Sequence, residues 1–441
     1  MNELLSARFQ MAFSLAFHMI FAAMGIGMPV LMLIAEGLWL RTREKDYLHL
    51  ARKWAKATAV LFAIGAVSGT VLSFELGLLW PKFMEFAGGI IGVAFALEGY
   101  AFFIEAIFLG LYLYGWDKLP PRIHWLCGFP VALSGLASGV LVLSANAWMQ
   151  SPTGFELVGG QPTSIDPVKA LFNPAWGVMA LHSTLSTYIA SAFAVSAVYA
   201  FAILRGKSEK YYQRALNIAM AVAAISALLM PLSGDASARS VAIRQPAKLA
   251  AMEGLFHSER GAGLSIGGWP DLEHEQLRYA VEIPKLLSFL AFHDPDALVR
   301  GLDSVPRDQW PNVVVVRAAF QVMVGLGIFL VVVSIWYWAS RFWRRLHTRW
   351  LYIALVLSGI AGYTALEAGW IVTEVGRQPW IIYGVMRTSE AVTPTEGVFE
   401  TLIAVVAIYA LLSLALVWLL LKLRDSNRNL PDLEVVDNAP A

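Results

Sequence analysis

The segment TALEAGWIVTEVGRQPW, from Thr364 to Trp380, decides how the rest of the chain is interpreted. Glu367, Trp370 and Glu374 follow the spacing i, i+3 and i+7, so a helix places all three on one face. An ionised carboxylate in hydrocarbon costs several kcal/mol. Each glutamate must therefore be protonated, be paired, bind a cofactor, or face water or the protein interior. On spacing alone, Glu374 could simply pair with Arg377 at the membrane surface.

The composition is that of an integral membrane protein. Of the 441 residues, 58% are hydrophobic and only 15% are charged, and stretches of about twenty apolar residues recur along the chain. The formal net charge of +1 gives no indication of a nucleic-acid partner. We therefore predict an all-α protein that lies in the lipid bilayer.

The apolar runs predict nine transmembrane helices. They cover residues 11–39, 55–80, 88–115, 124–149, 175–204, 214–233, 313–340, 350–374 and 397–422. Basic residues concentrate in alternate connections, at 41–56, 118–122, 205–214, 341–349 and 422–428. The short connections on the other side hold few of them, namely Arg8, Lys82, Lys169, Arg377 and Arg387. The positive-inside rule then places the N-terminus outside and the C-terminus in the cytoplasm.

This topology divides the chain into four parts. Helices 1–6 occupy residues 1–233, an extracytoplasmic loop occupies 234–312, helices 7–9 occupy 313–424, and a cytoplasmic tail covers 425–441. A connection as long as this loop is uncommon unless it is functional or folded. Its segment from Glu275 to Phe292 is expected to be helical. The sequence shows no internal repeat and no phosphate-binding loop.

Two histidines, His18 and His182, lie inside predicted spans, whereas the other six lie in loops or at helix ends. Both are about two turns from the outer end of their helices, and Met323 lies at a comparable depth. Imidazole is the usual axial ligand of haem iron, and methionine can supply the opposite side. Each residue could equally be a packed core side chain, and the pattern alone leaves both interpretations open.

Two carboxylates of the third span, Glu98 and Glu105, are seven residues apart and share one helix face. Such a column is suited to passing protons through the bilayer. Interhelical hydrogen bonds that hold the bundle together are the alternative, and this alternative has more weight for Glu36 and Glu75 than for Glu98 and Glu105. Spacing does not decide between them.

Four motifs follow one another in the order LEGYAFFIE in the third span, ANAWMQSP at 145–152, KLAAMEG at 248–254, and EAGWxxxE followed by GRQPW. They resemble the motifs of subunit I of the cytochrome bd family of quinol oxidases, and the resemblance covers nearly all nine spans. It implies that His182 and Met323 ligate a low-spin haem b. His18 and Glu374 would be the axial ligands of two high-spin haems, a haem b and either a haem d or a further haem b. Which ligand serves the oxygen-binding haem is left open.

The resemblance also implies roles for residues around the haems. Trp370 would lie between haems, and Arg8 would pair with a haem propionate. Arg377 would hold Glu374 in position and meet propionates. Lys248 and Glu253, in the outer loop, would contact quinol.

Further implications concern protons and partners. Glu98 and Glu105 would be proton-path residues, and the subunit would assemble with subunit II, with a small single-span subunit as a further candidate. Gln321 is a departure, because members of the family carry an arginine at this place, two residues before the methionine ligand. The outer loop resembles the short type.

The function implied is a terminal oxidase in the cytoplasmic membrane of a bacterium or an archaeon. It would oxidise quinol at the outer face and reduce O2 to water at a di-haem site, drawing protons from the cytoplasm and so generating membrane potential. Two other classes share the same spans and carboxylates. A proton-coupled secondary transporter would be colourless, and a haem subunit that only relays electrons would not consume oxygen.

Overall fold

The computed structural model describes residues 3–207 and 209–426, and within this part of the chain nine helices are long and apolar enough to cross a membrane. They are α1 (Glu3–Thr42), α2 (Lys45–Leu79), α3 (Pro81–Tyr114), α4 (Pro121–Gln150), α6 (Trp176–Leu204), α7 (Lys210–Arg244), α10 (Val313–Phe342), α11 (Arg349–Val375) and α13 (Val398–Ser426). The predicted all-α membrane fold is confirmed. Most of the predicted tail, 427–441, lies outside the described residues.

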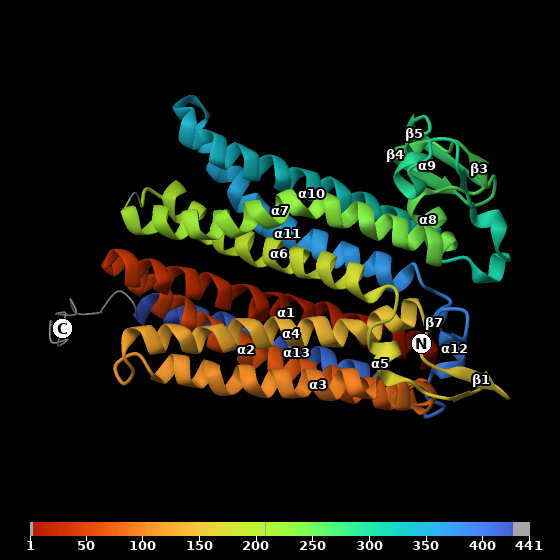
Figure 1. Cartoon of the computed structure of the whole chain (residues 1–441), viewed down its shortest axis with the longest axis horizontal. Coiled ribbons are helices and arrows are strands. Elements are labelled where there is room, and N and C mark those ends of the chain that lie inside the picture. The colour runs from red at the N-terminus through yellow and green to blue at the C-terminus, as the bar shows by residue number, and fades with distance from the viewer. Residues whose placement is uncertain (1–2, 208, 427–441) are drawn as a thin grey trace.

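The helices run side by side in two groups (Figure 1). One contains α1, α2, α3, α4 and α13, and the other contains α6, α7, α10 and α11. Helices joined by short connections pack against each other, as α1 does on α2, α3 on α4, α6 on α7, and α10 on α11. One apolar core spans both groups, because it includes side chains from α1, α2, α6, α7, α10 and α11.

The helix that contains the predicted sixth span is longer than that span. The predicted sixth span ends at residue 233, but α7 continues to Arg244. Beyond it lie α8 (Pro246–Glu253), β3 (Glu259–Arg260), β4 (Leu264–Asp271), β5 (Gln276–Ile283), α9 (Leu286–Phe292), β6 (Leu298–Val299) and two 3-10 turns (Leu302–Ser304 and Arg307–Gln309). The connection is therefore a small folded unit, which we call the outer loop.

The predicted helix from Glu275 to Phe292 is wrong over its first half. β5 pairs with β4 in an antiparallel hairpin, with Leu264 opposite Ile283, and only α9 is helical. The apolar residues Leu277, Tyr279, Val281 and Ile283 alternate with a period of two, which is typical of a strand.

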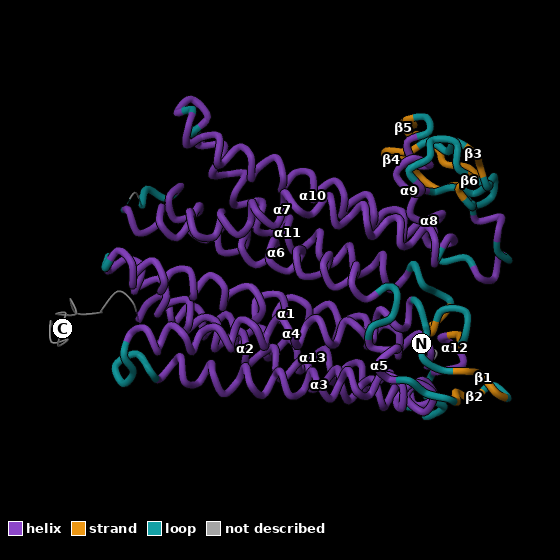
Figure 2. Tube along the Cα trace, in the orientation of Figure 1, coloured by secondary structure: helices purple, strands orange, loops and turns teal. Residues whose placement is uncertain are grey.

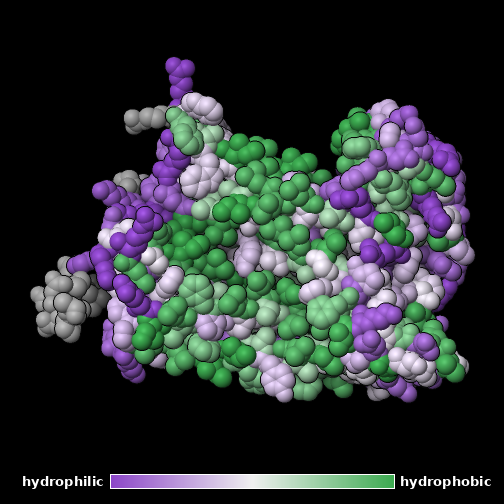
Figure 3. Space-filling view, in the orientation of Figure 1, coloured by the Kyte–Doolittle hydropathy of each residue, from purple (hydrophilic) through white to green (hydrophobic). Residues whose placement is uncertain are grey.

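The outer loop and the other short strands gather at the end of the bundle where α1 begins (Figure 2). We call this end the loop end and the opposite end, where α13 finishes, the tail end. The additional elements there are β1 (Glu156–Val158), β2 (Gln161–Thr163), α5 (Pro167–Leu171), β7 (Trp380–Ile382), β8 (Met386–Arg387) and α12 (Thr388–Ala391). Figure 3 shows apolar side chains over the middle of the visible face and polar ones at both ends, the distribution expected for a bilayer-spanning bundle.

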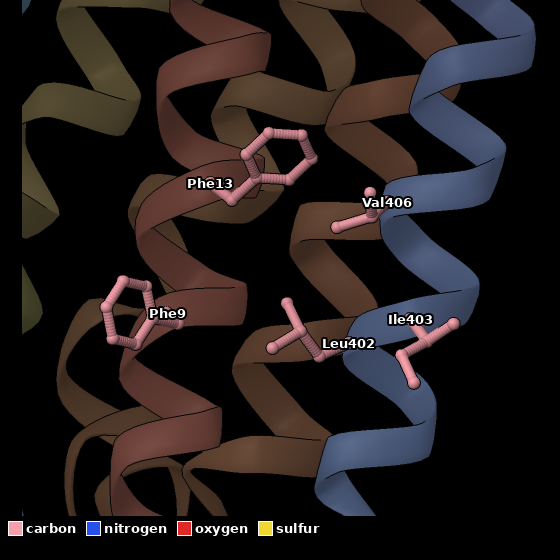
Figure 4. Close-up of a pocket in the computed structure, with 5 residues that line it drawn as sticks. All are labelled: Phe9, Phe13, Leu402, Ile403 and Val406. Carbon is pink, nitrogen blue, oxygen red and sulfur yellow. The ribbon is translucent and has the colours of Figure 1, made fainter. Parts of the chain in front are cut away.

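A surface groove of about 380 Å³ is lined by residues of α1 and α13 (Figure 4). It is lined by Phe9, Phe13, Leu402, Ile403 and Val406. All five side chains are apolar, so the groove offers no hydrogen-bond partner to a substrate. The side chains that can carry chemistry lie inside the bundle instead.

Candidate functional site

His182 faces α7 from a position about two turns into α6. Its Nδ1 is 3.1 Å from Ser233 Oγ, and the Ser233 hydroxyl donates to the Met230 carbonyl at 2.9 Å. Because the hydroxyl hydrogen is already engaged, the serine oxygen accepts from His182 and Nδ1 carries the ring hydrogen. Nε2 keeps its lone pair, which is the form in which imidazole ligates iron. Gly234 lies beside the ring, and a Cβ there would be in ordinary contact with Cε1 at 3.8 Å.

His18 has the same surroundings, supplied by α2. Its Nδ1 is 3.0 Å from Ser68 Oγ, and the Ser68 hydroxyl donates to the Gly65 carbonyl at 3.1 Å. A Cβ on Gly69 would lie 3.0 Å from His18 Cε1, so only glycine fits there without displacing the ring. Two helical hairpins, α1–α2 and α6–α7, thus carry one arrangement, a histidine facing a Ser-Gly pair. We call it the His/Ser-Gly module.

Met323 belongs to the same helix group as His182. Its thioether on α10 faces α11, where a Cβ on Gly369 would lie 3.2 Å from Sδ. The thioether and the imidazole are the donor set of a low-spin haem iron. Among the described residues, no group of three or more His, Cys, Asp or Glu side chains gathers as a metal cage. A lone imidazole or thioether is a side chain that can serve as an axial ligand of haem iron.

Glu374 lies at the loop end of α11 and is held by two side chains. Asn146 Nδ2 donates to Oε1 at 2.6 Å, and Arg377 Nη2 donates to Oε2 at 2.6 Å. Arg377 is buried, and its Nη1 has no partner among the described residues. Together they leave a fixed carboxylate beside a cationic nitrogen that is available to an anion.

Trp370 and Glu367 lie further along the same face of α11. Trp370 packs against a small cluster formed by Ala23 of α1, Ala190 of α6 and Leu366. It therefore stands between the helix that carries His18 and the helix that carries His182. Glu367 Oε1 is buried and has no partner among the described residues.

Glu98 and Glu105 face α4 from α3. Glu105 is buried, and a Cβ on Gly135 would lie 3.1 Å from its Oε1. Ser138 Oγ donates to Glu98 Oε1 at 3.3 Å. Small residues of α4 thus line the face that carries both carboxylates, which run from the middle of α3 toward the tail end.

Lys248 lies beneath the outer loop and is only 5% exposed. Its Nζ donates to Gln150 Oε1 at 2.6 Å and to the Thr373 carbonyl at 3.2 Å. Burial lowers the pKa of Lys248 to about 7, with a further lowering by Arg377 and an opposing effect of Glu374. The ammonium is thus directed at the end of α11.

Glu253 lies at the end of α8 beside a buried arginine. Arg317, one turn into α10 and 1% exposed, donates to Glu253 Oε2 at 3.4 Å. It also donates to the carbonyls of Met252, Ser265 and Gly267, at 2.9, 2.7 and 2.5 Å. Burial raises the pKa of Glu253 to about 7, although the Arg317 guanidinium opposes this rise. Arg317 therefore fixes both the carboxylate and the β4–β5 hairpin.

Two other predicted residues lie at the edges of these groups. Gln321, in the place of the expected arginine, accepts from the Gly267 amide at 3.0 Å and so helps Arg317 to hold the hairpin. Arg8 is exposed near the start of α1, at the loop end.

Several residues of the site were not predicted from the sequence. Arg317 gave a usable signal, because an arginine in the run VVVVRAAF is a charge that needs buried partners. Asn146 gave a weaker one, as an amide near the end of an apolar span. The Ser-Gly pairs at 68–69 and 233–234 follow the two histidines by about fifty residues, a regularity visible only once the helices are paired.

Comparison with known proteins identifies relatives over nearly the whole chain. The family model for cytochrome bd terminal oxidase subunit I matches residues 6–427. A protein of Bacillus subtilis (strain 168) that is provisionally named cytochrome bd menaquinol oxidase subunit I is 37% identical over 430 residues, which is 96% of each chain. The cytochrome bd ubiquinol oxidase subunit 1 of the same strain is 32% identical over 96% of this chain and 93% of that protein.

A solved structure is similar to the same extent. The bd oxidase from Geobacillus thermodenitrificans has a chain that superposes with a TM-score of 0.92 and is 37% identical, covering 97% of this chain and 99% of that one. These matches lead to one conclusion. The chain belongs to the cytochrome bd terminal oxidase subunit I family.

Proposed function

We propose that this protein is the haem-carrying subunit of a quinol oxidase that reduces O2 to water. The observation that carries the proposal is the repeated His/Ser-Gly module, in which two half-buried imidazoles each contact a serine hydroxyl through Nδ1 and so leave Nε2 for iron. The family implies haem cofactors, a quinol substrate and a subunit II partner, and we add a small single-span subunit as a candidate. Relatives named for menaquinol and for ubiquinol leave the quinone species open.

We infer that the loop end faces outward and the tail end faces the cytoplasm of a bacterium. The support is the concentration of basic residues in the connections at the tail end. Quinol would then reach the outer loop from the outer half of the membrane. Protons for oxygen reduction would have to cross the bundle from the tail end, so turnover would build membrane potential.

The neighbours of the proposed ligand residues support haem binding. Glycines face His18 and Met323 where a Cβ would crowd them, and Arg377 keeps one buried nitrogen for a propionate. We assign His182 and Met323 to a low-spin haem b, and His18 and Glu374 to the two high-spin haems. When bound, the haems supply the iron that carries electrons from quinol to oxygen and at which oxygen is reduced.

Other residues orient these ligands. Asn146 and Arg377 hold Glu374, and Trp370 stands between the two ligand groups. Arg8, exposed at the loop end, would meet a propionate at the membrane surface.

The two serines provide a reciprocal test of the haem assignment. Ser233→Ala removes the acceptor of the His182 hydrogen and should change the absorption spectrum and midpoint potential of the low-spin haem alone. Ser68→Ala should change only the high-spin signals, because it acts on His18. Loss of such a supporting partner weakens metal binding or activity by about 10–100-fold.

Redox titration followed by absorbance measures both effects, and Ser→Thr should restore each one because the hydroxyl remains. Identical spectra and potentials in both alanine variants would contradict the orienting role of the serines.

We propose that Glu253 accepts protons released by quinol and that Arg317 positions it. Above its pKa of about 7 the carboxylate can accept a proton, whereas below this value it is already protonated. Lys248, buried between Gln150 and the end of α11, would act from beneath the quinol site rather than on the loop surface.

Glu253→Ala should lower quinol oxidation by about 10²-fold while haem content is unchanged, since a positioned acid or base contributes about 10²–10⁴-fold. In the unmodified protein, quinol oxidation should decline as the pH falls through about 7. Steady-state oxidation of a soluble quinol measures both. Glu273→Gln, an exposed carboxylate in the same loop, is the control. Normal turnover of Glu253→Ala would remove this role.

We propose that Glu105 and then Glu98 carry protons from the tail end toward the haems. Their support is the shared face of α3 and the small α4 residues that line it. Each elementary charge moved across the membrane corresponds to about 2.3 kcal/mol per 100 mV.

A further inference from the structure

Three helices bring Glu36, Tyr112 and His124 together at the tail end, in the group shown in the lower half of Figure 1. Glu36 comes from α1, Tyr112 from α3 and His124 from the first turn of α4. All three are essentially inaccessible to solvent. The Tyr112 hydroxyl is 2.6 Å from Glu36 Oε2, and His124 Nδ1 is 2.7 Å from Glu36 Oε1.

The hydrogen-bond partners require this cluster to hold a proton. His124 Nε2 is 2.8 Å from the Tyr112 carbonyl, which can only accept, so Nε2 carries a hydrogen. The carboxylate of Glu36 and the lone pair of Nδ1 are both acceptors, and a contact of 2.7 Å between them needs a hydrogen in between. The pair is therefore either imidazolium with carboxylate or imidazole with carboxylic acid. Exchange between the two forms moves only the proton.

This cluster continues the carboxylate face of α3. Tyr112, Glu105 and Glu98 are spaced by seven residues, so they share one face at intervals of about two turns, or about 10 Å. Glycines of α4 pack on this face at two levels. A Cβ on Gly128 would lie 3.1 Å from the Tyr112 ring, and one on Gly135 would lie 3.1 Å from Glu105. The exchangeable groups therefore form one column that begins at the tail end.

A thin layer separates the cluster from water. The Trp116 ring packs on His124 with centroids 4.0 Å apart, and Arg52 of α2 lies over Trp116, 5.2 Å from its centroid. Arg52 also pairs with Asp117, whose side chain is exposed, at 3.1 Å. Arg52 and Asp117 are thus two charged groups between the cluster and the surface.

We propose that Glu36 and His124 form a proton-loading site at the cytoplasmic end of the α3 column, an inference that rests on the proposed oxidase function. A proton from cytoplasmic water bonds to the Glu36–His124 pair as the proton already held there leaves. The Tyr112 hydroxyl passes that proton on by accepting one hydrogen and releasing another. Each interval of about 10 Å is too long for a direct hydrogen bond, so bound water completes the path to Glu105 and Glu98.

Glu36→Gln in the complete oxidase complex tests the proposal, because the side chain keeps its shape and loses its proton. The glutamine amide can donate to neutral His124, and its carbonyl can accept from Tyr112. We expect unchanged haem content and spectra, with quinol turnover and proton uptake from the inside of proteoliposomes both at least about tenfold slower. Glu36→Asp should recover part of the rate. Glu85→Gln, an exposed carboxylate near the loop end of α3, should behave as the unmodified protein.

Wild-type turnover and proton uptake in Glu36→Gln would overturn the proposal. If that variant fails to assemble with haem, His124→Asn replaces it, since asparagine can donate to Glu36 but cannot take up a proton, and the same outcomes apply. Glu105→Gln separates the two hypotheses. Slow proton uptake in Glu105→Gln together with a normal rate in Glu36→Gln would disprove only the loading site. Normal rates in both variants would disprove the proton route along α3 as well.

Discussion

Met323→Leu is expected to abolish or strongly shift the low-spin haem signal while the high-spin signals largely remain. The substitution removes the thioether that would ligate the iron, but leucine has nearly the same volume. Such volume-conserving changes usually cost less than about 1.5 kcal/mol of stability, so the protein should still fold. Quinol turnover should fall at least by the roughly 10–100-fold that loss of a supporting residue causes.

Reduced-minus-oxidised absorbance spectra of the purified complex measure this effect. Met220→Leu is a matched control, because Met220 is a fully buried methionine of α7 in the main apolar core. Unchanged spectra for Met323→Leu would refute the assignment of this ligand. Changed spectra in both variants would show that the effect comes from packing and not from lost ligation.

Glu105→Gln is expected to reduce oxygen-linked turnover by about 10²-fold and to slow the build-up of membrane potential in proportion. Glutamine keeps the size of the side chain but cannot release a proton. Haem content should be retained, because a buried carboxyl group is replaced by a neutral amide of the same shape.

Turnover in proteoliposomes with a potential-sensitive dye measures both quantities. Glu85→Gln, an exposed carboxylate on the same helix, is the control and should have no effect. Full activity in Glu105→Gln would leave interhelical hydrogen bonding as the role of the α3 carboxylates.

The nine spans could be predicted because each is a long apolar run, which needs no knowledge of neighbouring helices. The same reasoning failed in the outer loop. There, the segment from Gln276 to Ile283 forms a strand because it pairs with β4. Its alternating apolar residues indicate a strand, but the prediction was a helix. α7 continues past residue 233 because polar residues near its end are tolerated outside the apolar core of the bundle.

Residue type and depth were enough to propose candidate ligands, but the surroundings of these residues could not be predicted. His18 and His182 stood out as histidines inside apolar helices, whereas Ser68 and Ser233 are ordinary residues until the helices are paired. His124 was assigned to a helix end, yet it is buried against Glu36. Such partners depend on contacts between distant segments, which periodicity along one sequence does not contain.

The two glutamates of the segment from Thr364 to Trp380 have different surroundings. Glu374 is held by hydrogen bonds from Asn146 and Arg377. Glu367 has one buried oxygen without a partner among the described residues. We infer that Glu374 belongs to the haem site and that Glu367 is a structural or proton-handling carboxylate.

The most direct test of the account is oxygen uptake by the purified complex supplied with quinol. The proposed oxidase function predicts steady oxygen consumption, with two quinols oxidised for each O2, because reduction of O2 to two waters takes four electrons and four protons. A colourless protein without oxygen uptake would indicate a transporter. A haem-containing complex that is reduced by quinol but consumes no oxygen would indicate an electron relay, and either result would contradict the account.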